Sequence, residues 1–239
     1  MIKVSIFKSK VLEIEKPSQD LRILRFSAPE DFEFKAGQYL SLSVFRQDGA
    51  KIRRPLSIAN APDKKGKSNF IEFCIKLISG GLASEFIKKL KVGDEVELFG
   101  PAGRFTIDSN EKMGLFFVAS GVGIAPFVGM ITDLLNKKYN GKVILLKSAR
   151  SEKDSLYDKE FSELAKTHEN FRFYNIFSQP RDSEGKNVGH VQDFIEKYLP
   201  KGFKGDFYVC GLQEMIAGTK EKLSDLGIEE ARIFEEKFD

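Results

Sequence analysis

The hydrophobic periodicity of this 239-residue chain changes near residue 110, and that change limits the folds open to it. Before this point apolar and polar residues alternate, as in "NFIEFCIKLI", where every second residue from Ile71 to Leu77 is apolar. A period of two is typical of half-buried antiparallel strands, and glycine-containing turns separate the alternating segments. Residues 1–108 therefore predict a small antiparallel β-barrel or sandwich.

After residue 110, continuous apolar strands alternate with helical segments. The strand "GLFFVAS" is followed by the helix-like "PFVGMITDLLNKKY", and the same order is repeated as far as "DFYVCG" and "EMIAGTKEKLSDLG". Four strand–helix repeats are typical of a parallel sheet that is covered by helices on both faces. We therefore expect two domains, an antiparallel β-barrel over residues 1–108 and a parallel-sheet α/β domain over residues 109–239.

Composition excludes several classes of site and partner. The net charge of +3 is too small to predict nucleic acid as a partner. Residues 1–108 hold 19 lysines and arginines against 14 acidic residues, an excess that can steer an acidic ligand or simply aid solubility. The two cysteines and two histidines lack metal-ligand spacing, so we expect no metal and no iron–sulfur cluster. With no long apolar run, we expect a cytoplasmic protein without a membrane span.

Two segments of the amino-terminal half are candidate phosphate sites. The first, "RRPLSIAN" at residues 53–60, has two arginines whose planar donors fit a phosphate beside the rigid Pro55. A solvated strand end explains the same pair equally well. The second, "SGGLASEF" at residues 79–86, places Gly80 and Gly81 before a short helix whose first amides can bind an anion. Helix capping by one of its serines is the alternative.

The carboxyl-terminal half has two further candidates. In "ASGVGIAP", residues 119–126, Gly121 and Gly123 allow a tight turn that suits a pyrophosphate. A plain strand-to-helix turn is the alternative, because the spacing is G-x-G-x-x-P and not the dinucleotide fingerprint. Cys210 and Gly211 end a predicted parallel strand, where ligands of such sheets bind. A phosphate site in each half suggests two nucleotides.

Taken in order, six segments resemble motifs of the ferredoxin-NADP reductase superfamily. They are "AGQYLSL", "RRPLSIA", "GGLASEFIKKLKVGDEVELFGPAGRF", "ASGVGIAPF", "YVCGLQEM" and "FEEKF", and together they span nearly the whole chain. The resemblance implies an antiparallel barrel that binds a flavin, usually FAD, and an α/β domain that binds NADPH or NADH. It also implies a flavoprotein oxidoreductase in which hydride passes between the nicotinamide and the flavin.

The resemblance places flavin contacts in the amino-terminal domain. Arg54 is similar to the arginine that clamps the flavin phosphate, and Ser57 to the serine whose hydroxyl faces flavin N5. The other residues that it places at the flavin are Pro55, Leu56, Cys74, Ile75, Lys76, Gly81, Leu82, Ala83 and Ser84. Leu56 departs from the family, which usually has an aromatic residue there, so stacking on the outer face of the flavin is lost at that position.

In the second domain, the resemblance implies a nicotinamide dinucleotide site. The residues that match its turn are Gly121, Val122, Gly123 and Pro126, with Val122 in place of a threonine. Cys210 and Gly211 match the pair beside the nicotinamide ring. Glu236 and Phe238 resemble the carboxylate and terminal aromatic near the flavin, followed here by Asp239. Ser57, Cys210 and Glu236 are thus the candidate catalytic residues, with Ser57 and Cys210 orienting the reactants and not acting as nucleophiles.

The choice between NADPH and NADH depends on residues after the second and third strands of the α/β half. Arg150 and Ser178 lie there and suit a 2′-phosphate, whereas an NADH site commonly has an acid at the second strand end. The sequence therefore favours NADPH. Glu152 and Asp154 nearby weaken this preference, and Arg150 is also compatible with a surface charge.

Three interpretations of the electron acceptor follow. A ferredoxin or flavodoxin carrier is acidic and fits the basic amino-terminal half, so we expect it. Free flavin is the alternative, which would make the protein an NAD(P)H:flavin reductase. A third interpretation is an electron-transfer subunit of a larger complex. No pattern in the sequence indicates an oligomeric state.

Overall fold

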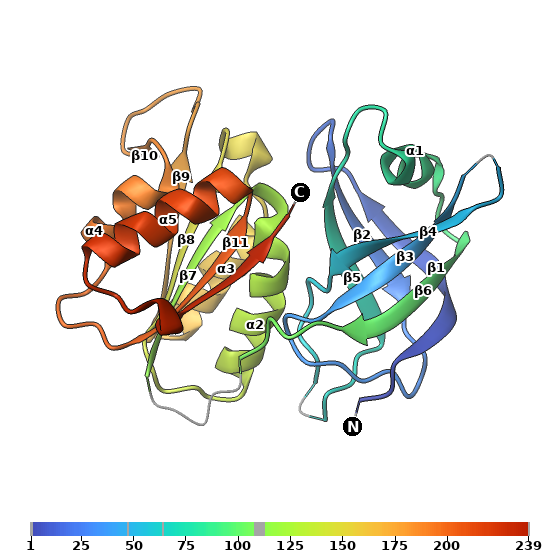
Figure 1. The fold of residues 1–239 in the computed structure, drawn as a ribbon, viewed down its shortest axis with the longest axis horizontal. Helices are drawn as coiled ribbons and strands as arrows, with labels where there is room; N and C mark the ends of the chain where they lie inside the picture. Colours follow the sequence, from blue (N-terminus) through green and yellow to red (C-terminus); the bar gives the residue numbers. More distant parts are fainter. Residues whose placement is uncertain (1, 47, 64, 108–112, 239) are drawn as a thin grey trace. The chain divides into compact units, whose positions relative to one another are not determined.

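The computed structural model describes residues 2–238 except residues 47, 64 and 108–112 (Figure 1). It divides into two compact units. The first comprises Met1–Ile107 with Ala125–Asp133, and the second comprises Asp108–Ile124 with Leu134–Asp239. The predicted domain boundary between residues 108 and 109 lies outside the described residues.

The first unit is built on a six-stranded antiparallel sheet with the order β4-β3-β6-β1-β2-β5. Its strands are β1 (Ser5–Glu15), β2 (Leu21–Ser27), β3 (Tyr39–Phe45), β4 (Lys51–Ser57), β5 (Phe70–Lys76) and β6 (Glu95–Ala102). The helix α1 (Leu82–Lys89) connects β5 to β6. Ile58, just after β4, bridges Phe73 of β5 in the antiparallel sense, so the two outer strands meet and the sheet closes into a barrel.

Alternation along the strands accounts for the core of this barrel. Leu40 and Leu42 of β3 are fully buried in it, together with Phe73 of β5. The other face of β5 differs from the predicted half-buried strand, because Glu72 and Cys74 are buried as well. The carboxylate of Glu72 forms an ion pair with Arg25 of β2, which compensates the cost of burying its charge.

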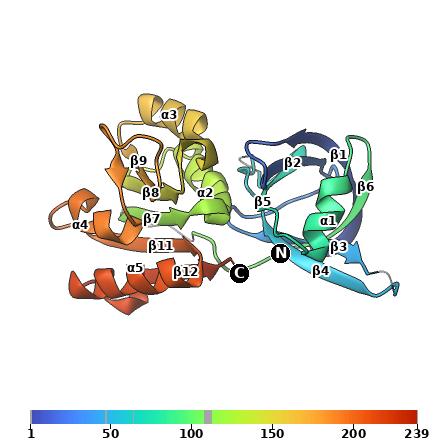
Figure 2. The ribbon, with the colours of Figure 1, turned by 90° about the horizontal axis from the view of Figure 1, so that it is seen from above.

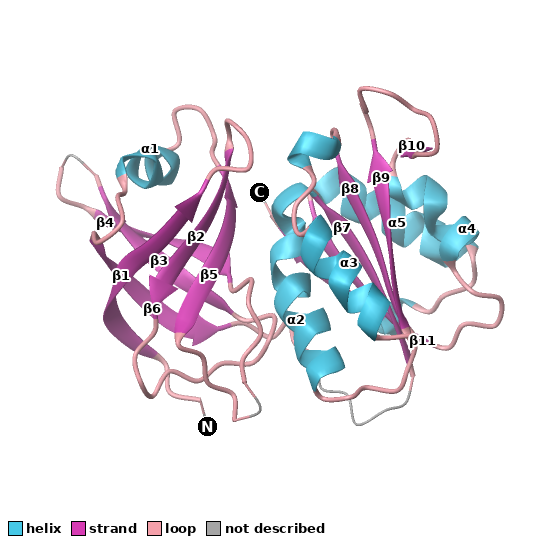
Figure 3. Cartoon of the chain, turned by 180° about the vertical axis from the view of Figure 1, so that it is seen from behind, coloured by secondary structure: helices cyan, strands magenta, loops and turns pink. Residues whose placement is uncertain are grey.

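The second unit contains a six-stranded parallel sheet with the order β10-β9-β8-β7-β11-β12. Its strands are β7 (Gly114–Ser120), β8 (Val143–Ala149), β9 (Phe171–Phe177), β10 (Asn187–Val188), β11 (Gly205–Gly211) and β12 (Ile233–Lys237). The helices of this half of the chain are α2 (Ala125–Asn136), α3 (Asp158–Thr167), α4 (Ile195–Tyr198) and α5 (Gln213–Asp225). Figures 2 and 3 show α3 on one face of the sheet and α5 on the other.

The predicted fold class, an antiparallel barrel followed by a parallel-sheet α/β domain, is confirmed. The short β10 and the terminal β12 extend the four predicted parallel strands at the two edges. Continuous apolar strands build the second core, where Val118 of β7, Leu146 of β8 and Val209 of β11 are fully buried. Among the described residues, no helix is both long and apolar enough to span a membrane.

Candidate functional site

The strand ladder between β4 and β5 stops beside the segments predicted to hold the flavin. Ile58 bridges Phe73, and the Ala59 N–H donates to the Glu72 carbonyl oxygen at 2.8 Å. If the same antiparallel register continued from Ile58 back into β4, Ser57 would lie opposite Cys74. Within the described residues, however, no ladder joins β4 to β5. Among the described residues, no strand ladder therefore pairs residues 54–57 of β4 directly with residues 74–76 of β5.

Adjacent arginines on β4 lie on opposite faces of the strand. The guanidinium of Arg53 lies over the ring of Phe99, 4.3 Å from its centroid. Arg54 is exposed and shares its face of β4 with Ile52 and Leu56, which pack against the barrel core. Its guanidinium donates to the Arg53 carbonyl oxygen at 3.4 Å, and no described carboxylate pairs with it. Arg54 is therefore the arginine that is free to bind an anion.

The second candidate phosphate site lies at the start of α1. Gly80 has a φ of +71°, a conformation that favours glycine, and Gly81 is the N-cap without a side-chain hydrogen bond. Ser84 does not cap the helix, because its hydroxyl oxygen accepts the Ile78 N–H at 2.8 Å. The amides of the first turn are thus left for an anion.

The packing of α1 relates this turn to Arg54. Leu82 and Ala83 of its first turn pack against the same core cluster as Ile52 and Leu56, the neighbours of Arg54 on its face of β4. The structure thus brings two kinds of phosphate donor, a guanidinium and helix amides, to elements that share one core.

In the second unit, the glycine turn after β7 lies against the end of β11. Gly121 has a φ of +53° and begins a 3-10 turn, Gly121–Ile124. A Cβ at Gly123 would lie 2.3 Å from the Cys210 carbonyl oxygen. Glycine is required at position 123 because the backbone of β11 occupies the space of a side chain. Pro126 follows in the first turn of α2.

β12 brings two of the predicted residues to this end of β11. The parallel register places Cys210 opposite Glu236, and the Phe238 N–H donates to the Gly211 carbonyl oxygen at 3.0 Å. Burial and, to a smaller extent, the charge of Glu236 raise the pKa of the Cys210 thiol well above its ordinary value. A neutral, buried thiol is not a nucleophile at neutral pH. Asp239 lies outside the described residues.

Arg150 and Ser178 lie on neighbouring segments after β8 and β9. The Ser178 N–H donates to the Ala149 carbonyl oxygen at 3.1 Å, and the Gln179 N–H donates to the Arg150 carbonyl oxygen at 2.7 Å. Glu152, one of the two acids that weaken the NADPH preference, forms an ion pair with Lys186 at 2.6 Å, and this contact lowers the pKa of its carboxyl. The carboxylate of Glu152 is therefore already paired with a cation, whereas that of the second acid, Asp154, accepts a hydrogen bond from the Ser151 hydroxyl at 2.6 Å.

The predicted flavin contacts of the barrel all lie in the first unit. The predicted residues of the carboxyl-terminal half lie in the second unit, except Pro126, which belongs to the segment Ala125–Asp133 of the first. The group of flavin contacts is Arg54, Pro55, Leu56, Ser57, Cys74, Ile75, Lys76, Gly81, Leu82, Ala83 and Ser84. Sequence reasoning assigned no role to Asn60, although it is polar, buried and adjacent to this group. The sequence feature that could have identified Asn60 is its position as a polar residue directly after the apolar pair Ile58 and Ala59.

Comparison with known proteins gives matches over both units. The model of the oxidoreductase FAD-binding domain matches residues 8–107, and that of the oxidoreductase NAD-binding domain matches residues 117–221. The reductase component of phenol 2-monooxygenase from Pseudomonas sp. is 33% identical over 98% of this chain, which spans 66% of that protein. Ferredoxin–NADP reductase B from Sorangium cellulosum is 29% identical, with 100% of both chains covered.

A solved structure shares the whole architecture. The crystal structure of a ferredoxin NADP+ reductase from Neisseria gonorrhoeae, with bound FAD and NADP, has a TM-score of 0.82 to this chain. The match covers 97% of this chain and 98% of that one, at 22% sequence identity. The two proteins therefore share their fold.

Proposed function

Because this chain belongs to the ferredoxin-NADP reductase superfamily, we propose that it oxidises NADPH or NADH through bound FAD and passes the electrons to a ferredoxin- or flavodoxin-type carrier. Its FAD-binding and NAD-binding domains confirm the family and the two cofactor classes that the sequence predicts. The proposal rests above all on one observation: the guanidinium of Arg54, which pairs with no described carboxylate, and the start of α1, which has no side-chain cap, belong to elements that pack on one core.

The residues of the first unit fit FAD. Arg54 and the first amides of α1 would hold the pyrophosphate, since both are donors that no described side chain neutralises or caps. Residues 54–57 of β4 and 74–76 of β5, which no described ladder pairs with each other, would hold the ring system. When bound, FAD supplies two-electron exchange with a nicotinamide and one-electron exchange with a carrier.

We assign non-covalent roles to the three candidate catalytic residues. Ser57 is buried at the end of β4, where its hydroxyl would orient the flavin. Cys210 stays a neutral thiol, so it would shape the nicotinamide site through its volume and not through proton transfer. Glu236 lies beside Cys210 in the register of β11 and β12, and would contribute a negative charge to that site.

NADPH is the preferred nucleotide in this proposal. The backbone contacts that hold Arg150 and Ser178 on neighbouring segments support a shared 2′-phosphate site. Pairing of Glu152 with Lys186 supports it further, because it compensates the negative charge near that site. Domains over residues 1–108 and 109–239, and a cytoplasmic location, stay predictions from the sequence.

One purification of the full chain tests the function. We expect a yellow protein that keeps FAD through gel filtration, oxidises NADPH faster than NADH, and reduces a ferredoxin or flavodoxin faster than free FMN. A colourless protein that reduces free flavin would replace this function with that of a flavin reductase. A yellow protein that oxidises neither nucleotide would indicate a subunit that needs another chain.

A further inference from the structure

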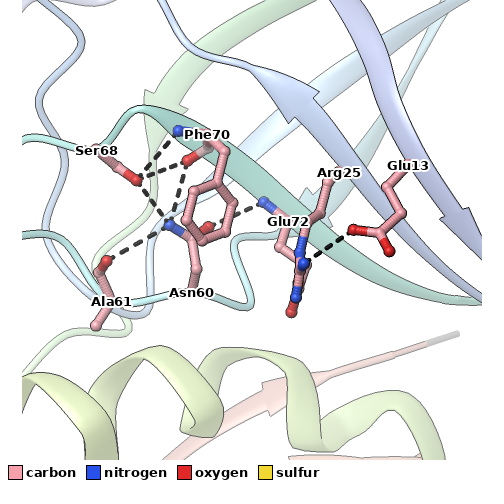
Figure 4. Close-up of polar contacts among 7 residues, drawn as sticks. All are labelled: Glu13, Arg25, Asn60, Ala61, Ser68, Phe70 and Glu72. Atoms are coloured by element: carbon pink, nitrogen blue, oxygen red, sulfur yellow. Dashed lines mark hydrogen bonds and ion pairs between the residues drawn. The ribbon is translucent and has the colours of Figure 1, made fainter. Parts of the chain in front are cut away.

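The barrel closes where Ile58 and Ala59 pair with β5, and the side chain of the next residue continues the hydrogen bonding to β5 (Figure 4). Asn60 is the next residue, and its side-chain Oδ1 accepts the backbone N–H of Glu72 at 2.9 Å. The carboxamide thus occupies the place that a backbone carbonyl would have in a continued ladder.

The amide nitrogen of the same side chain extends this contact along β5. Asn60 Nδ2 donates to the Phe70 carbonyl oxygen at 3.2 Å and to the Ser68 hydroxyl at 3.0 Å. A longer contact reaches the Ala61 carbonyl oxygen at 3.4 Å. With Asn60 only 7% exposed, these bonds are largely shielded from water. A replacement that cannot form them would leave buried polar groups of β5 without partners.

Glu72 is anchored from its other side by charge. Its carboxylate accepts a hydrogen bond from Arg25 Nε at 2.6 Å, and Arg25 also pairs with Glu13 at 2.9 Å (Figure 4). These contacts tie β5 to β2 and β1. Because its side chain is held by this network, Glu72 gives Asn60 a fixed backbone group to bind.

The contact between Asn60 and Glu72 lies next to the flavin segments of the first unit. Ser57 is three residues before Asn60, and Cys74 is two residues after Glu72. From these two residues onward, β4 and β5 are not joined by a ladder among the described residues. The pairing of Ile58 and Ala59 with β5 lies between Asn60 and this point, and the Asn60 bonds hold that pairing from its other end. Through this pairing they influence how far apart the two segments lie.

We propose that Asn60 is a positioning residue of the flavin site, whose carboxamide fixes the separation of residues 54–57 from residues 74–76. It acts through the two strands and not as a ligand of the flavin. This role rests on the proposed FAD-binding function, and it makes FAD affinity depend on a side chain that belongs to the barrel closure.

The test compares Asn60→Ala with a matched change at a similar amide. Asn170 Nδ2 donates to the carbonyl oxygens of Tyr139 and Gly141 at 2.7 and 2.9 Å, and Asn170 lies in the second unit just before β9. FAD affinity is measured by fluorescence titration of the apoprotein, the ring environment by visible circular dichroism, and stability by urea unfolding. We expect Asn60→Ala to raise the FAD dissociation constant at least tenfold and to change the visible spectrum. Asn170→Ala should leave both within twofold.

The outcomes separate this role from a general loss of stability and from failure of the proposed function. Equal FAD affinity and spectra in wild type and Asn60→Ala, or an equal loss in the Asn170→Ala protein, would overturn the positioning role. If Asn60→Ala does not fold, Asn60→Asp and Asn170→Asp are compared by the same criteria. Asp keeps the acceptor for the Glu72 N–H and loses the donors. Wild-type protein that binds no FAD would instead overturn the proposed function.

Discussion

Single residues of β4 show how strand alternation separates two neighbouring charges. Arg53 and Arg54 have the same chemistry, but one lies over the ring of Phe99 and the other has no described carboxylate partner. A guanidinium over an aromatic face already has a stabilising contact. The side chain of Arg54 lies on the same face of β4 as Ile52 and Leu56, but its guanidinium is exposed. Its N–H donors therefore stay available to a ligand. The two arginines differ in their contacts because successive side chains of a β-strand point to opposite faces.

Removal of each arginine should therefore have a different effect. Arg54→Ala is expected to weaken FAD binding about tenfold or more, because charge-assisted hydrogen bonds contribute about 1.5–3 kcal/mol. Arg53→Ala is expected to lose about 0.5–1 kcal/mol of stability with the cation–π contact and to bind FAD as the wild type does. Fluorescence titration and urea unfolding measure the two quantities. Equal losses of FAD affinity in both variants would contradict the assignment of the phosphate to Arg54.

At the level of elements, the sequence predicted what depends on local pattern and missed what depends on distant partners. The hydrophobic periodicity of the sequence identified the strands, and its glycines identified the turns before α1 and after β7. The buried second face of β5 was not predictable from alternation, because Glu72 is compensated by Arg25, 47 residues away in the sequence. Asn60 was missed for the same reason, since its partners lie on β5, across the barrel closure.

The turn after β7 provides a test of close packing between elements. Gly123→Ala would place a Cβ 2.3 Å from the Cys210 carbonyl oxygen, and backbone cannot rotate away as a flexible side chain does. We expect a loss of about 1–3 kcal/mol in unfolding free energy, as for other overpacked sites, and weaker NADP+ binding. Isothermal titration and urea unfolding measure these effects.

A glycine in α5 supplies the control for this change. At Gly218 the nearest atom to a new Cβ is Nε2 of Gln192 at 3.3 Å, the mobile end of a long side chain. Gly218→Ala should keep NADP+ affinity and gain about 1 kcal/mol of helix stability. If Gly123→Ala bound NADP+ as tightly as Gly218→Ala, the turn would not be part of the dinucleotide site.

Across the whole molecule, each half of the chain has a core of its own and matches a different cofactor-binding domain. The barrel core includes Leu42 and Phe73, and the α/β core includes Val118 and Val209. The matches to FAD-binding and NAD-binding domain models also fall separately on residues 8–107 and 117–221. A ligand stabilises the states that bind it, so each nucleotide should protect the elements of its own site first.

Hydrogen-exchange mass spectrometry can locate both nucleotides on one protein. With FAD at about 100 times its dissociation constant, openings that release it become less favourable by about 2.7 kcal/mol, so exchange through them slows about 100-fold. We expect that slowing in β4, in β5 and at the start of α1, with β8 and β9 unchanged. NADP+ should slow exchange in the turn at residues 121–124 and at the end of β11. The glycine variant Gly123→Ala should lose the NADP+ effect and keep the FAD effect. Protection by FAD that was as strong in β8 and β9 as in β5 would contradict a flavin site built by the barrel.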